Sequence, residues 1–146
     1  MPVEYLILPE FDVTYVKYYG RVTVSQIALA FDVHQSDKDF KPGRGEFADL
    51  SNVVKFDMKF ANVASHFDRM IKSYSANGAK TLTAIFAPQP DQAALAYAYA
   101  KMTQTSDILE ARVYEDADKA IRDLGLTIPA QEFFDEVKAC GTETPR

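Results

Sequence analysis

The sequence predicts an α/β domain whose sheet of four to five strands is mostly parallel, with an antiparallel edge strand, four helices and one extra C-terminal helix. Three observations indicate this class. Two strand-like segments open the chain, helical and strand-like segments then alternate along it, and the composition suits one globular core, with 47% hydrophobic and 25% charged residues over 146 positions. Strands that alternate with helices imply right-handed crossovers between parallel neighbours.

The first third of the chain predicts a hairpin followed by a helix. Residues 4–8 and 13–19 are rich in Tyr, Val, Ile and Leu, and Gly20 is expected to end the second strand. Thr23 and Gln26 have the spacing of a capping box, so a helix should begin here and end before residue 42. Its apolar face would carry Val24, Ile27, Ala28, Phe31 and His34.

The middle of the chain predicts a short buried strand, a turn and a long helix. The strand is expected over residues 46–50, and residues 49–53 read as an Asp-Leu-Ser-Asn-Val turn. Asp57 is expected to cap the following helix, which should stop at Asn77-Gly78. The apolar stripe of that helix would consist of Phe60, Val63, Ala64, Phe67, Met70, Ile71 and Tyr74.

The last part of the chain repeats the alternation. Strands are expected over residues 82–87 and 109–114, with helices after Asp91 and after Asp116. The inward face of the first helix would carry Ala94, Leu95, Ala98, Tyr99 and Met102, and that of the second Ala117, Ala120, Ile121 and Leu124, closed by Gly125. Residues 1–126 are expected to form the domain, and residues 127–146 a helical extension and tail.

Composition excludes several classes of function. The net charge of −5 argues against a general nucleic-acid binder, which needs a concentrated basic face. No apolar run has the length of a membrane span, and a cytoplasmic protein is expected. Cys140 is the only cysteine, so no internal disulfide can form, and neither a metal nor a cofactor is expected.

Catalytic machinery is not predicted. The chain has only His34 and His66 as imidazole bases, and His66 is expected to be a solvated surface residue off the apolar stripe. A hydrolase site built from Asp49, Asp57 and His66 at the carboxyl end of the strands is the least supported hypothesis. The chain is therefore expected not to be an enzyme.

Short motifs in a fixed order resemble a known family. Asp49-Leu50 follows the third strand, Ala87-Pro88 ends the fourth, and residues 113–116, Val-Tyr-Glu-Asp, precede an Ala-containing helix. Together they resemble the SpoIIAA-like, or STAS, domains of anti-sigma-factor antagonists, in their uncharacterised bacterial branch, with CRAL-TRIO (SEC14-like) domains as lipid-binding relatives. The resemblance covers residues 5–126.

The resemblance implies a regulatory module that lacks its usual switch. In anti-sigma-factor antagonists a Ser or Thr at the start of the helix accepts phosphate, which adds about two negative charges. Here Asp57 is followed by Met58, which has no hydroxyl. Ser51 is the nearest hydroxyl, and a local bond to backbone in the turn is its expected role.

The leading hypothesis is therefore a non-enzymatic module that binds a protein or a small apolar ligand. A carrier of lipids or apolar metabolites is the alternative, and it requires a cavity between helices and sheet. A homodimer is expected, because Phe133 and Phe134 point about 100° apart on a helix and one groove should not bury both. The candidate residues for binding a ligand or partner are Asp49, Ser51, Asn52, Asp57, Met58, His66 and Tyr97.

Overall fold

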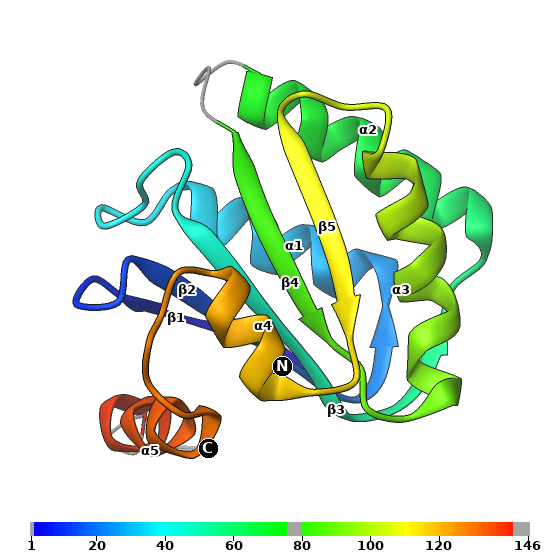
Figure 1. Cartoon of the computed structure of the whole chain (residues 1–146). Coiled ribbons are helices and arrows are strands. Elements are labelled where there is room, and N and C mark those ends of the chain that lie inside the picture. Colours follow the sequence, from blue (N-terminus) through cyan, green and yellow to red (C-terminus); the bar gives the residue numbers. More distant parts are fainter. Residues whose placement is uncertain (1, 76–79, 142–146) are drawn as a thin grey trace.

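A five-stranded mixed sheet forms the centre of the computed structural model, which describes residues 2–75 and 80–141 (Figure 1). The strands lie in chain order, β1 pairs antiparallel with β2, and the other neighbours are parallel. This confirms the predicted fold class. The elements are β1 (Val3–Leu8), β2 (Val13–Thr23), α1 (Val24–Gln35), β3 (Gly45–Asp57), α2 (Phe60–Ser75), β4 (Thr81–Phe86), α3 (Pro90–Thr103), β5 (Leu109–Tyr114), α4 (Ala117–Asp123) and α5 (Ala130–Gly141).

The capped starts of α1 and α4 were predicted correctly. Thr23 and Gln26 form the capping box of α1: the Thr23 amide donates to Gln26 Oε1 at 2.8 Å, and the Gln26 amide donates to Thr23 Oγ1 at 3.4 Å. The side chain of Asp116 accepts from the Asp118 amide at 2.9 Å at the start of α4. After α4, Gly125 has a φ of +92°, a conformation that favours glycine.

The predicted turn at residues 49–53 is wrong, because β3 continues as one strand to Asp57. Its second half pairs with a second half of β2 that also extends beyond Gly20, in a register from Tyr19 opposite Asn52 to Thr23 opposite Asp57. Inter-strand pairing has therefore overridden the local turn propensity of Asp, Ser and Asn.

The sequence predicts that Asp57 caps α2, and the structure shows that it does not. Its carboxylate lies at the end of β3 and accepts from the Arg21 guanidinium on the neighbouring strand, at 2.5 Å from Nη2. The helix begins at Phe60 instead, and Asn62 Oδ1 accepts from the Lys59 amide at 2.8 Å. The predicted stop at Asn77-Gly78 lies outside the described residues.

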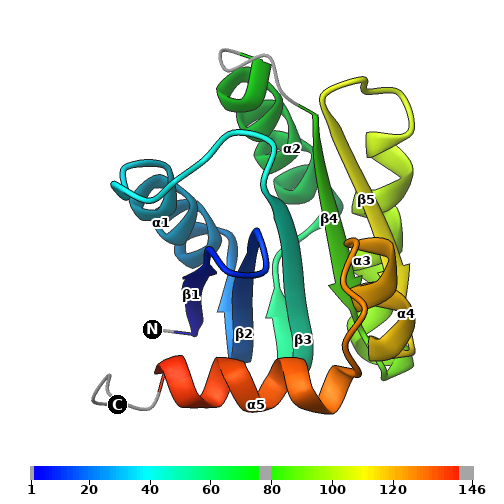
Figure 2. The same cartoon turned by 60° about the vertical axis from the view of Figure 1, so that its left-hand side comes forward.

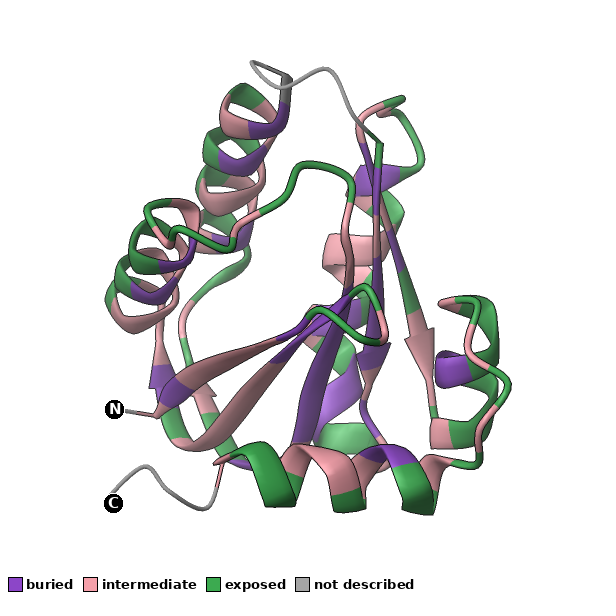
Figure 3. Ribbon diagram, turned by 90° about the vertical axis from the view of Figure 1, so that its left-hand side faces the viewer, coloured by how far each residue is buried: buried purple, intermediate pink, exposed green. Residues whose placement is uncertain are grey.

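The helices cover the two faces of the sheet unequally. Figure 1 shows α4 in front of the sheet and α1 behind it. The side chains that pack with α1, α2 and α3 form two clusters on one face, and those that pack with α4 and α5 form a third on the other. Burial is concentrated in the strands between these layers (Figure 3).

Two predicted helix faces need correction. Phe60 was placed on the apolar stripe of α2, but it stands at the first residue of the helix and is 59% exposed. On α3 the buried residues include Ala93 and Ala96, whereas Ala94 is exposed. The alanine-rich sequence of α3 gave little amphipathic contrast, so the inward face was assigned about one residue off.

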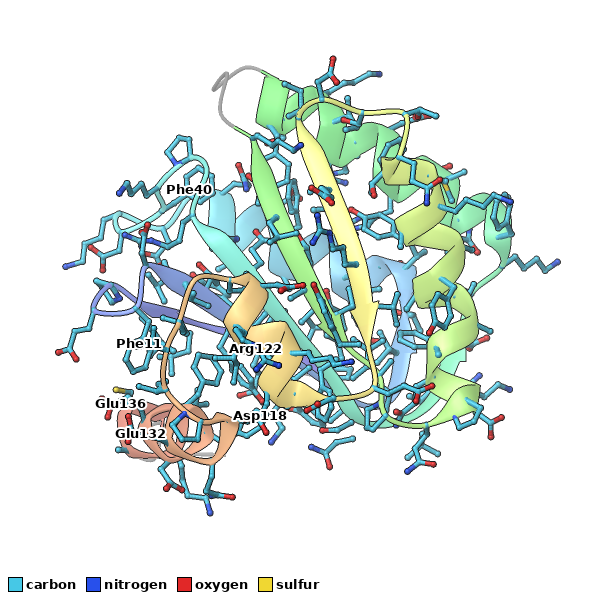
Figure 4. The ribbon with its side chains drawn as sticks, in the orientation of Figure 1. Phe11, Phe40, Asp118, Arg122, Glu132 and Glu136 are labelled. Carbon is cyan, nitrogen blue, oxygen red and sulfur yellow. The ribbon has the colours of Figure 1, made fainter. Side chains whose placement is uncertain are left out.

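The C-terminal helix packs on the sheet face that α4 also covers (Figure 2). Phe133 is fully buried, and its ring lies 5.2 Å from that of Phe47, while the Phe134 ring lies 5.7 Å from the same ring. Phe11, in the turn after β1, lies beside α5 (Figure 4), with its ring 5.9 Å from Phe133. Because both phenylalanines of α5 find partners within the chain, the argument from them for a second chain does not hold, and the homodimer stays a prediction.

Candidate functional site

A cavity of about 130 Å³ lies between the sheet and helices α1, α2 and α3. Most of its wall is apolar. Strands β1 to β4 supply one side and the three helices the other. The lining residues are Val3, Tyr5, Val16, Tyr18, Val24, Ile27, Ala30, Phe31, His34, Glu46, Ala48, Leu50, Phe56, Met58, Asn62, Val63, His66, Met70, Thr83, Ile85, Leu95, Ala96 and Tyr99.

Small side chains at the places where the layers face one another leave this space open. Ala30 on α1, Ala48 on β3 and Ala96 on α3 all line the cavity and are all buried. An alanine fills less volume than the leucine or phenylalanine common in such positions. Larger side chains do not close the space, since Phe60 is 59% exposed and Phe31 and Met70 stand in the wall.

A buried glutamate provides the acidic group of the cavity. Glu46 is 7% exposed and stands on β3 with Ala48 and Leu50, the other members of the period-two set that faces the cavity. Its Oε2 accepts from the Tyr74 hydroxyl at 2.8 Å, and its Oε1 accepts from the Thr83 hydroxyl at 3.0 Å. These two bonds compensate part of the cost of burying the carboxyl group.

Three tyrosines around the cavity have raised pKa values. Burial is the main cause for Tyr18, Tyr74 and Tyr99, and the negative charge of Glu46 is the second. All three therefore stay protonated at neutral pH. The Tyr99 hydroxyl donates to Met70 Sδ at 3.0 Å, and this bond joins α3 to α2 in the cavity wall.

His66 is a partly buried residue of the cavity wall, so the prediction of a solvated surface histidine was wrong. Its ring lies 6.0 Å from Phe31 and 6.3 Å from Tyr99. Burial lowers its pKa to about 4, helped by the positive charge of Arg69, so the imidazole is neutral at pH 7. Its Nδ1 is buried and has no hydrogen-bond partner among the described residues.

His34 contributes a second imidazole to the wall, from the end of α1. It is 6% exposed and lies between two aromatic rings, with Tyr5 at 5.0 Å and Phe40 at 5.2 Å. Figure 4 shows Phe40 in the loop after α1. Burial lowers the pKa of His34, although Glu46 and Asp37 oppose this shift.

The structure brings only Met58 and His66 of the predicted candidates to the cavity. Asp49 faces the opposite side of the sheet, where its Oδ2 accepts from the Tyr15 hydroxyl at 2.5 Å, and its Oδ1 accepts from the Ser51 hydroxyl at 2.6 Å. Asp57 is exposed and paired with Arg21. The predicted convergence of Asp49, Asp57 and His66 is therefore wrong.

The other two candidates lie on the surface. Asn52 is exposed on β3, and Tyr97 is 53% exposed on α3, where the sequence had placed it off the packed face.

Sequence reasoning missed the polar group at the base of the cavity. Glu46 lies in a strand that the sequence predicts to be buried, where a charged residue is unusual. That anomaly, together with the period of two that puts Glu46 on one face with Ala48 and Leu50, was the available signal. Nothing local in the sequence indicated that Tyr74 and Thr83 would bond to it, because both lie more than 25 positions away.

The described residues offer neither a membrane-spanning helix nor a metal cluster. Over residues 2–75 and 80–141, none of the helices combines the length and apolar character needed to cross a membrane. The same residues contain no cluster of three or more His, Cys, Asp or Glu side chains suited to a metal ion.

Comparison with solved structures finds a structural likeness. No family model matches the chain, and no curated protein matches it. The solved structure of the anti-sigma factor antagonist SpoIIAA in its unphosphorylated form is similar over 93% of this chain and 97% of that one, with 12% sequence identity and a TM-score of 0.44.

Proposed function

We propose that this protein is a non-enzymatic binding module that takes one small, largely apolar molecule into the cavity between the sheet and α1, α2 and α3. The observation that carries the proposal is the cavity itself, with its mostly apolar wall and a few polar positions, among them Glu46 and His66. Ligand sites in proteins commonly have this composition, in which apolar surface supplies affinity and a few polar groups fix orientation.

The size of the cavity limits the ligand. Its volume of about 130 Å³ is close to that of an engineered apolar cavity of roughly 150 Å³ in another protein, which binds benzene. A molecule with a single ring therefore fits the space without rearrangement. A long acyl chain would require the helices to move apart, so the single-ring ligand is favoured over a lipid carrier function.

The absence of a catalytic role is part of the proposal. His66 and His34 are each packed against aromatic rings, and Asp49 and Asp57 lie away from both. A nucleophile, a base and an orienting group in mutual reach would support an enzyme, and these candidates do not form such a set.

The proposal also excludes a phosphorylation switch at the start of α2. Met58 lines the cavity at the position where the resemblance expects a hydroxyl. Ser51 donates its hydroxyl to Asp49 within a paired strand, 2.6 Å from Oδ1, and its amide donates to the same oxygen at 3.0 Å. Regulation by a protein partner stays a prediction.

Calorimetric titration with benzyl alcohol tests the proposal. We expect saturable binding at one site, weakened at least tenfold by Ala96→Leu, which extends a buried alanine into the cavity. Ala94→Leu is the matched control, since it makes the same change at an exposed position of the same helix and should leave binding unchanged. The proposal fails if the wild-type protein does not bind, or if Ala96→Leu folds and binds as the wild type does.

A further inference from the structure

Among its described residues, the cavity wall has an acidic side chain but no lysine or arginine to balance it. Glu46 is its only carboxylate, and neither a lysine nor an arginine is among the described lining residues. The guanidinium nearest in sequence, Arg44, donates instead to Asp12 Oδ1 at 3.0 Å and to the Asp39 carbonyl at 2.9 Å. A buried carboxylate without a cation is costly in an apolar setting.

Two of the polar side chains in the wall, Glu46 and His66, retain capacity to accept hydrogen bonds. Each carboxylate oxygen has two lone pairs, and each oxygen of Glu46 accepts one described bond, from Tyr74 or Thr83. The neutral ring of His66 offers an acceptor at Nδ1 when its proton is on Nε2.

From this arrangement we infer that the cavity selects ligands that carry a hydrogen-bond donor, above all a protonated amine, and rejects anions such as carboxylates. The inference rests on the proposed function, because it names the chemical class of the molecule in the same cavity. An ammonium group beside Glu46 would supply the missing cation and take up its free lone pairs. A carboxylate in that place would meet a like charge with no basic side chain to offset it.

The lowered pKa values of the two wall histidines agree with this selectivity. Burial holds both His34 and His66 neutral at pH 7, so neither supplies a positive charge for an anion. Tyr5 and the other wall tyrosines, whose pKa values are raised, add no charge either.

Three probes that share one ring and differ in one group test the inference on the wild-type protein. Benzylamine, benzyl alcohol and benzoate are titrated at pH 7 by calorimetry. We expect benzylamine to bind at least tenfold more tightly than benzoate, with benzyl alcohol between them. Benzoate binding as tightly as benzylamine would overturn the inference while leaving the proposed function intact. Failure of all three to bind would overturn both.

A variant then assigns the selectivity to Glu46. Glu46→Gln should weaken benzylamine about 10- to 100-fold, the loss typical of a hydrogen bond to a charged group, and change benzyl alcohol less than about threefold. Glu10→Gln is the control, because it makes the same change of net charge in the exposed turn after β1. Equal losses in the two variants would show that general attraction to an acidic protein causes the preference, and would contradict the inference. The ligand series on the wild type decides the question even if Glu46→Gln does not fold.

Discussion

The two faces of the sheet are packed by different means. On the face covered by α4 and α5, Phe47, Phe133 and Ile121 have no exposed surface and phenyl rings meet at 5 to 6 Å. On the face covered by α1, α2 and α3, alanines stand at the positions that line the space between the layers, and a cavity of about 130 Å³ is left.

The two faces therefore have different roles in stability and in the proposed binding. Interiors of proteins are normally close-packed, so an open volume beside buried polar groups is a cost that the rest of the fold must offset. The phenylalanine cluster under α5 provides that stability on one face. The other face is then available for a ligand.

The largest effect on stability should come from removing a ring on the face covered by α4 and α5. Phe133→Ala should lower the free energy of unfolding by about 3 to 5 kcal/mol, because it deletes a fully buried ring and leaves a void. The same change at Phe67 should cost about 1 to 2 kcal/mol, because this ring is only partly buried, beside Tyr99 on the face covered by α1, α2 and α3. Denaturant unfolding measures both.

Phe60→Ala serves as the control in that series. Its ring is 59% exposed, so the change should stay within about 0.5 kcal/mol of the wild type. If Phe133→Ala cost no more than Phe67→Ala, the contrast between the two faces would be lost.

Acid should destabilise the protein through His66, which lies on the face covered by α1, α2 and α3. This effect should be smaller than that of Phe133→Ala. Burial lowers the pKa of this group to about 4 from an ordinary value of 6.5. Between these values the unfolded chain binds a proton that the folded chain does not, so the contribution of His66 to stability is complete above pH 6.5 and is lost as the pH falls toward 4. The loss should be about 2 to 3 kcal/mol.

Comparison of the wild type with His66→Leu isolates this contribution. Unfolding free energies measured from pH 7 to pH 4 should fall more steeply in the wild type than in the variant. His34, whose pKa is also lowered by burial, and the carboxylates remain in both proteins, so their effects cancel. Parallel pH profiles would mean that His66 is accessible to protons in the folded state.

The smallest effect should follow treatment with a serine kinase of the anti-sigma type. We expect no phosphate on Ser51, because its hydroxyl is bonded to Asp49 within β3 and the start of α2 carries Met58. Mass spectrometry of the treated protein checks this. Stoichiometric phosphate on Ser51 would show that this part of β3 opens readily.

Local signals in the sequence predicted the order of elements and the class of fold. Capping residues such as Thr23 and Asp116 and the glycine after α4 act within a few positions, so the sequence shows them directly. The second half of β3 was missed because its pairing with β2 joins residues more than 30 positions apart. That long-range pairing overrode the local turn propensity of Asp49 to Val53.

The candidate site was predictable only in part. Met58 and His66 were among the expected residues, yet for His66 the expected environment was wrong, since its burial depends on rings supplied by α1 and α3. Glu46 and the alanines that leave the cavity open have no motif in the sequence. An open volume is a property of three packed layers, and single-chain periodicity carries no signal for it.

Localising a bound probe tests directly whether the cavity between the sheet and α1, α2 and α3 is the binding site. Benzyl alcohol is titrated into isotope-labelled protein while the backbone amide resonances are followed by NMR. We expect saturable shifts that concentrate in α1, α2 and α3, whose side chains line the cavity, with α4 and α5 unchanged. Shifts that concentrate in α4 and α5, or no shifts at all, would contradict it.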